Sequence, residues 1–251
     1  MWLGAASGVG PFRVRDETMT MTVFSKLRDD PPQLWRAGGP SLGARRHPLL
    51  MVDTDPVEVE RLLLAGELAC PPCGGVLRPW GHARWRSSRC ERGGVRHRPR
   101  RANCLGCART HVLLSVVWLG RRADAAAVIG AALLAKASGL GHRPIAAALC
   151  RPASTVRGWL RRFGRRAVDV RGLFTGLLLA LDPEAGPLLP MGSVFADAVE
   201  VLGRAAAAAV VRLSPIPPWE FASRATGGLL LAPPMLSGST ACSTGRLSNT
   251  S

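Results

Sequence analysis

The spacing of apolar residues changes along this chain from a period of two to a period of about 3.6. From Val76 to Arg101, arginines alternate with apolar and aromatic residues, and Gly93-Gly94 offers a turn. This pattern predicts a β-hairpin. Thr110–Trp118, with the sequence THVLLSVVW, predicts a further strand. After Asp124 the apolar residues recur every three or four positions, which predicts amphipathic helices.

Three helices are expected to follow the strands. The first spans Asp124–Ser138 and ends at Gly139, and the second starts near Pro144. After the short turn Cys150-Arg151-Pro152, the third helix carries an apolar stripe of Val156, Trp159, Leu160 and Phe163. Three helices with a tight turn between the last two have the layout of a helix-turn-helix.

The third helix has a basic outer face. Successive 100° steps along the helix place four residues opposite the apolar stripe: Ser154, Gly158, Arg161 and Arg165. Arg157 and Arg162 flank them. A recognition helix presents polar and cationic groups to the major groove. The candidate DNA contacts are therefore Ser154, Arg157, Arg161, Arg162 and Arg165. A solvated basic helix of another helical domain would have the same pattern, so that alternative stays open.

Two cysteine pairs precede these helices, Cys70-Pro-Pro-Cys73 and Cys104-Leu-Gly-Cys107. Two C-x-x-C pairs supply four thiolates, the ligand set of a tetrahedral structural Zn²⁺ site. We therefore predict a zinc ribbon with Cys70, Cys73, Cys104 and Cys107 as ligands. A redox dithiol or a disulfide framework explains the two pairs less well, because neither a βαβ pattern nor a secretory signal is evident. Substitute ligands could come from Cys90, His82, His97 or His111, which are expected to be bystanders.

The segments outside this region are less regular. Pro56–Ala65 predicts a short helix, capped within Asp53–Asp55 and stopped by Gly66. Val168–Leu181 and Met191–Leu213 predict helices that pack either on each other or on a second copy of the chain in a homodimer. The expected organisation is a disordered extension over 1–50, a zinc ribbon over 51–120, a helix-turn-helix over 121–166, a helical region over 167–214 and a loose tail over 215–251. Met51 is a plausible alternative start to Met1.

The charge of the chain restricts the class of partner that it can bind. The net charge is +16, and residues 70–166 hold 20 Lys/Arg against only Glu91 and Asp124, a local charge of +18. Such a concentration suggests a polyanionic partner, with phosphate contacts from arginines of the ribbon: Arg84, Arg86, Arg98, Arg100 and Arg101. Apolar stretches are too short to span a membrane. A cytoplasmic, nucleoid-associated protein is expected, and no small-molecule substrate is evident.

The stretch from Cys70 to Phe163 carries a resemblance. CPPCGG, LRPWGHAR, CLGCARTHVLL, RRADAAAVIGAALLA and GHRPIAAALCRPASTVRGWLRRF resemble an actinobacterial family of unknown function that pairs a zinc ribbon with a homeodomain-like helix-turn-helix. The layout is also similar to the DNA-binding heads of insertion-sequence transposases. Two residues depart from helix-turn-helix patterns. Cys150 stands where glycine is usual, at a turn that favours a left-handed conformation, and Pro152 stands at the usual serine cap.

These observations predict a mainly α protein with a small β zinc ribbon that binds double-stranded DNA in a zinc-dependent way, as a transcriptional regulator or as the targeting part of a mobile element. One alternative is a transposase or nuclease, for which Asp197 and Glu200 share a helical face, although no credible catalytic constellation surrounds them. Another is an RNA- or protein-binding ribbon, in which Trp80, Trp85 and Trp118 could stack on bases. Those tryptophans are rather expected to pack the core around the metal.

Overall fold

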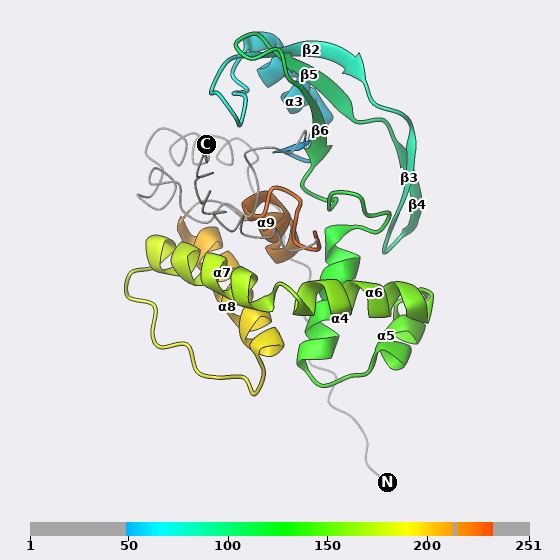
Figure 1. Ribbon diagram of the computed structural model, residues 1–251, viewed down its shortest axis with the longest axis vertical. Helices are drawn as coiled ribbons and strands as arrows, with labels where there is room; N and C mark the ends of the chain where they lie inside the picture. Colours follow the sequence, from blue (N-terminus) through cyan, green and yellow to red (C-terminus); the bar gives the residue numbers. More distant parts are fainter. Residues whose placement is uncertain (1–48, 213–214, 233–251) are drawn as a thin grey trace, which may run out of the picture.

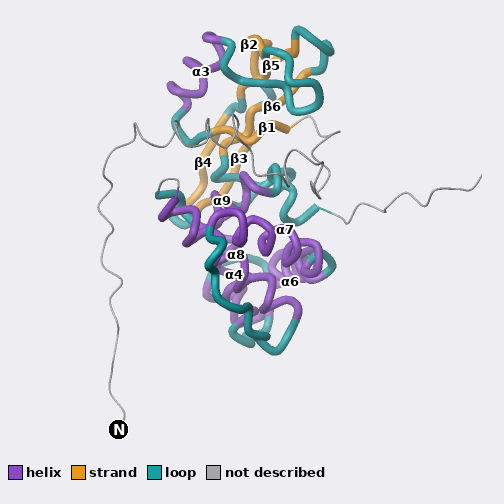
Figure 2. The backbone as a smooth tube through the Cα atoms, turned by 90° about the vertical axis from the view of Figure 1, so that its left-hand side faces the viewer, coloured by secondary structure: helices purple, strands orange, loops and turns teal. Residues whose placement is uncertain are grey.

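The computed structural model describes residues 49–212 and 215–232, and its larger sheet lies at one end of the molecule while most of its helices lie at the other (Figures 1 and 2). In chain order the elements are β1 (Leu49–Val52), α3 (Pro56–Ala65), β2 (Leu77–His82), β3 (Arg86–Cys90), β4 (Gly93–His97), β5 (Arg100–Cys104), β6 (Thr110–Ser115), α4 (Ala126–Ala137), α5 (His142–Ala148), α6 (Ala153–Gly164), α7 (Ala167–Leu181), α8 (Val194–Arg212) and α9 (Pro218–Ala225). No helix in these ranges is both long and apolar enough to cross a membrane.

A four-stranded sheet has the order β1-β6-β5-β2. β1 runs parallel to β6, while β5 is antiparallel to both β6 and β2. The predicted helix α3 packs beside β2 with Val59, Leu62 and Leu63 buried. The Asp55 side chain accepts a hydrogen bond from the Val57 N–H, and Gly66 ends the helix at φ 76°. The caps read from the sequence are therefore confirmed, because a carboxylate and a left-handed glycine satisfy the free groups at helix ends.

The predicted hairpin is present but extends further than one pair of strands. β2 pairs with β5 near the cysteines, and β3 pairs with β4 in a separate two-stranded sheet farther along. Figure 1 shows the two pairs as one long arm that reaches from the upper sheet down to the helices. The turn of the outer pair lies at residues 91–92, because Cys90 is paired with Gly93. The prediction that Gly93-Gly94 forms the turn is wrong: both glycines belong to β4.

The helices enclose the larger core. The predicted apolar side of α4 is buried, and α6 buries Val156, Trp159 and Phe163. α7 and α8 pack closely against each other, as one of the two alternatives from the sequence proposed. α4 starts at Ala126 rather than at Asp124, which leaves the Asp124 carboxylate free for contacts outside the helix.

The predicted loose tail over 215–251 is wrong for its first part. Residues 218–225 form α9, and Leu230 and Leu231 are each only 1% exposed. The Trp219 ring lies over Gly130 of α4, where a Cβ atom would come within 2.0 Å of it. Proline therefore starts a helix here instead of ending one. Residues 233–251, and residues 1–48 of the predicted extension, lie outside the described part of the chain, while Leu49 and Leu50 begin β1.

Candidate metal centre and basic surface

Strand pairing brings the two cysteine pairs together. The first pair lies directly before β2, and the second pair starts at the last residue of β5. Because Leu77 of β2 is paired with Cys104 of β5, the two loops meet at one end of the sheet. The Leu105 N–H also donates to the Val76 carbonyl at 3.0 Å, which fixes one loop against the other.

The two cysteine loops have the same backbone geometry. In each, the residue after the second cysteine has a positive φ, 71° at Gly74 and 56° at Ala108. In each, the N–H of that residue donates to the carbonyl of the first cysteine, at 2.8 Å and 3.0 Å respectively. Glycine adopts this left-handed conformation readily at position 74. The left-handed turn at Ala108 was missed, because alanine gives no sequence signal for a positive φ.

The four sulfur atoms form a compact cluster. All four Sγ atoms lie within 4.8 Å of one another, with Cys70 to Cys107 at 3.7 Å and Cys73 to Cys104 at 3.4 Å. Four sulfurs at ~2.3 Å from one tetrahedral ion would lie ~3.8 Å apart. The donor set and spacing therefore fit one metal ion. In the described ranges no second group of three or more His, Cys, Asp or Glu side chains has such an arrangement.

Local groups favour a thiolate at Cys104. Burial by itself would raise the pKa of that thiol, but the N–H groups of Cys107 and Gly106 and the Cys73 side chain lower it to about 6. The two N–H groups lie 3.5 Å and 3.3 Å from its sulfur. At Cys70, burial dominates and raises the pKa to about 12. A bound cation would offset that cost, because a coordinated thiol is deprotonated.

His111 is the one bystander histidine that touches the cluster. Its Nε2 atom lies 3.3 Å from the Cys70 sulfur, and the residue is 1% exposed. An imidazole N–H in this position would orient a ligand sulfur, as outer partners do in metal sites. Cys90 and His97 lie away from the cluster, on the β3–β4 hairpin.

The predicted DNA contacts on α6 and at its C-cap, Arg165, are mostly exposed. Ser154, Arg157, Arg161 and Arg165 are exposed, Arg162 is half-buried, and the opposite side of the helix is buried. No carboxylate in the described ranges forms an ion pair with any of these arginines. α6 therefore presents a cationic surface that is not neutralised within this part of the chain.

The predicted ribbon arginines divide into two groups. Arg84, Arg86 and Arg98 are exposed on the long arm. Arg100 instead pairs with Glu60 at 2.8 Å and donates to the Gly81 carbonyl at 2.7 Å, so it ties α3 to the sheet. Arg101 is half-buried within β5. Two of the five arginines are therefore integrated into the sheet rather than displayed.

The prediction that the tryptophans pack the core around the metal is also wrong. Trp118 is buried, but in the core of the helices and not around the sulfurs. Trp80 and Trp85 are each 58% exposed. The Arg96 guanidinium lies 5.3 Å from the centre of the Trp85 ring, a cation–π contact on the surface of the arm.

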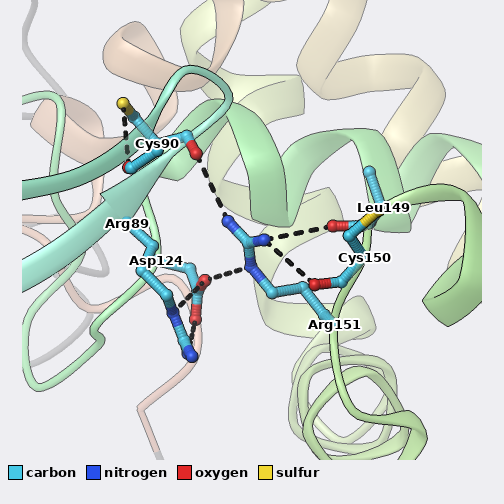
Figure 3. Close-up of polar contacts among 7 residues, drawn as sticks. Arg89, Cys90, Asp124, Leu149, Cys150 and Arg151 are labelled. Atoms are coloured by element: carbon cyan, nitrogen blue, oxygen red, sulfur yellow. Dashed lines mark hydrogen bonds and ion pairs between the residues drawn. The ribbon is translucent and has the colours of Figure 1, made fainter.

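An ionic network centred on Asp124 was not predicted from the sequence. Its carboxylate is 3% exposed and accepts hydrogen bonds from Arg89 of β3 at 3.0 Å and 2.8 Å and from Arg151 at 2.7 Å. Arg151 also donates to the Cys90 carbonyl at 3.3 Å (Figure 3). The available signal was that Asp124 is one of two acids in a strongly basic segment.

Asp197, an acid of the nuclease alternative, has a local role. It accepts a hydrogen bond from the Met191 N–H at 2.7 Å and lies 3.9 Å from the guanidinium of Arg171. These contacts connect α8 to the linker before it and to α7.

Comparison with protein-family models, with curated proteins and with solved structures gives no match for this chain. The metal cluster and the basic surfaces are therefore interpreted from their own geometry and chemistry.

Proposed function

We propose that this protein binds double-stranded DNA through α6 and that a structural Zn²⁺ ion holds its ribbon together. α5 and α6 would form a helix-turn-helix, with α6 as the recognition helix. The protein would act as a transcriptional regulator or as the targeting part of a mobile element. The observation that carries this proposal is the exposed cationic face of α6, which faces away from its own buried stripe.

The turn between α5 and α6 supports the helix-turn-helix assignment. Cys150 has φ 49°, the left-handed conformation that this turn favours. Pro152 is the N-cap of α6 and makes no side-chain cap, so the first N–H groups of the helix are not satisfied by a capping side chain. Those N–H groups are suited to bind a DNA phosphate.

Zinc is the metal that the donor set favours. Four cysteine sulfurs at tetrahedral spacing form the closed site of structural zinc, which has no open position for chemistry. The role assigned to the ion is to stabilise a sheet with a small apolar core. That role makes DNA binding dependent on zinc without placing the ion at the DNA.

A binding titration at several salt concentrations tests the proposal. Zinc-loaded protein should bind random duplex DNA with a steep salt dependence, because arginine–phosphate contacts release counterions. After selection of a preferred site, Arg161→Ala should weaken binding to it by ~1–3 kcal/mol and relax its specificity.

Arg212→Ala removes the same charge from the end of α8 and is the matched control. Equal effects of Arg161→Ala and Arg212→Ala would contradict a specific role for α6. Absence of binding by metal-loaded protein would contradict the proposal as a whole.

Single-stranded RNA is the second candidate partner, favoured by one observation. Trp80 and Trp85 are exposed beside arginines, an arrangement suited to stacking on unpaired bases. Tighter binding of single-stranded RNA than of duplex DNA at equal salt, abolished by Trp85→Ala, would favour this alternative.

A further inference from the structure

The β3–β4 hairpin has one side turned to the protein and one to solvent. Cross-strand partners share a side, so Ser88 and His97 lie on the same side of the hairpin as Arg86 and Val95. Ser88 is 4% exposed, and the His97 ring stacks on Trp118 at 4.9 Å. Through Ser88 and His97 this side packs on the body of the protein, while Arg86 and Val95 remain exposed.

The opposite side of the hairpin is cationic. It carries the cross-strand pairs Ser87–Arg96 and Arg89–Gly94. Gly94 adds no side chain there, and Arg96 is held over the Trp85 ring. In the described ranges no carboxylate forms an ion pair with Arg96, or with the exposed Arg92 of the turn and Arg84 before β3. Polyanionic phosphate is the complementary partner for such a surface.

The Asp124 network joins this solvent-facing side to the turn before α6. Arg89 lies on that side and donates two hydrogen bonds to the carboxylate. Arg151 donates to the same carboxylate from the α5–α6 turn, and to the Cys90 carbonyl at the end of β3. Figure 3 shows the carboxylate between the two guanidinium groups. The backbone adds two bonds, Arg89 N–H to Ala123 at 2.6 Å and Ala125 N–H to Arg89 at 2.8 Å.

We propose that the hairpin and α6 contact one DNA duplex as a single rigid body, with the hairpin on phosphates beside the groove that α6 enters, and with Asp124 as the residue that fixes their relative position. The inference rests on the proposed binding of DNA by α6. It adds a second contact element and a reason for burying a carboxylate in the most basic segment of the chain. A buried carboxylate between two arginines is a costly way to gain stability, but it specifies geometry well.

The first test distinguishes the hairpin contact from the α6 contact, because loss of a phosphate contact lowers affinity for all sequences and loss of a base contact lowers sequence preference. Arg96 is exposed, so Arg96→Ala should fold normally. It should weaken binding to selected and random duplexes by the same factor, roughly tenfold, and lower the salt slope by about one, as the loss of a phosphate contact does. Arg161→Ala should instead relax sequence preference. Hydroxyl-radical footprinting should show that Arg96→Ala loses protection at one flank of the site only.

The second test concerns Asp124 as a positioning residue. Asp124→Asn should keep its metal content and its sequence preference, yet lose the same flanking protection as Arg96→Ala. Adding Arg96→Ala to Asp124→Asn should then cost little further affinity, because the hairpin contact is already lost. If the Asp124 variant fails to fold, the Arg96 footprint alone decides.

An unchanged affinity and footprint for Arg96→Ala, alongside an intact effect of Arg161→Ala, would overturn this inference while leaving α6 as the DNA contact. Loss of binding to single-stranded RNA but not to duplex DNA in Arg96→Ala would also overturn it. If neither Arg96→Ala nor Arg161→Ala changed DNA binding, the proposed function itself would fail.

Discussion

The sheet that carries the cysteines and the helices α4–α9 bury very different amounts of apolar surface. The core at the sheet end is made of small and aliphatic residues and includes two of the four cysteines themselves, Cys70 and Cys104. The helical core contains Phe163, Phe174 and Phe221 and extends to Leu231 of the C-terminal segment. Large aromatic side chains contribute most to a core's stability.

This difference predicts that the two ends have different sources of stability. A small domain with few buried side chains cannot offset its conformational entropy by burial alone, and it needs a cross-link or a metal. The helices bury more and larger apolar side chains, so we expect them to fold without one. The Asp124 network and the stacking of His97 on Trp118 lie where the two ends meet.

Metal removal should have the largest effect, and it should destabilise the sheet end much more than the helices. Chelation should remove about 10 kcal/mol or more of stability from the sheet end, because metal binding is the folding energy of such sites. Amide hydrogen exchange should then show lost protection in β2 and β5 and retained protection in α7 and α8. Cys104→Ser should have the same effect, and Cys90→Ser, which removes a thiol outside the cluster, should not. A single loss of structure across both ends would refute independent stabilisation.

A larger residue at Gly130 should perturb the helical end alone. Its Cβ would lie 2.0 Å from the Trp219 ring, so Gly130→Val should displace α9 from α4 at a cost of about 1–3 kcal/mol or more. Chemical denaturation measures the loss, and metal affinity should stay unchanged. In Gly172→Ala the new methyl group meets nothing within 4 Å in α7, so that control should be stabilising by ~0.5–1 kcal/mol. Weakened metal binding in Gly130→Val would show that the two ends are coupled.

Mild acid should weaken the contact between the two ends. Burial, with a smaller contribution from the Arg86 charge, lowers the pKa of His97 below its ordinary 6.5. The unfolded chain then takes up a proton before the folded protein does. The stability contributed by neutral His97 is therefore complete above about pH 6.5 and declines as pH falls toward the lowered pKa.

Denaturation at pH 7, 6 and 5 should accordingly give a decline that is smaller in His97→Phe, which keeps the ring on Trp118 but cannot be protonated. Some decline should remain in that variant, because burial also lowers the pKa of His111. An identical pH dependence in the two proteins would exclude His97 as the source.

The smallest expected effect is at the α5–α6 turn. Cys150 holds φ 49°, a conformation that costs a non-glycine residue about 1 kcal/mol. Cys150→Gly should therefore raise stability by up to ~1 kcal/mol in thermal or chemical denaturation. Ala147→Gly, in the right-handed α5 helix, is the matched control and should lower stability by ~1 kcal/mol. Destabilisation by both glycines would mean that the turn is not strained.

Local patterns in the sequence were sufficient for elements whose ends have chemical signals. Pro56–Ala65 was predicted to the residue, because Asp55, Pro56 and Gly66 mark its two ends. The cysteine spacing likewise predicted a four-sulfur cluster, which the structure contains. The helix-turn-helix, the choice of zinc and the DNA partner stay predictions.

Patterns failed where long-range contacts determine the outcome. A loose tail was predicted from residue 215, yet Pro218–Ala225 is helical because Trp219 fits over Gly130, 89 positions earlier in the chain. Arg100 was expected to bind phosphate, but strand pairing places it beside Glu60. Neither contact can be predicted from the local spacing of apolar and polar residues.

What the sequence by itself determined is therefore local: helix caps, strand and helix periods, and the thiol ligands with their two-residue spacers. These depend on backbone dihedral angles and on neighbours a few positions apart. The tertiary structure decided which charged side chains form ion pairs within the protein and which are exposed to solvent. Of the two acids in the basic segment, Asp124 became the buried junction of two arginines, because chain pairing brought residues 89, 124 and 151 to one point, and a carboxylate removed from water requires such partners.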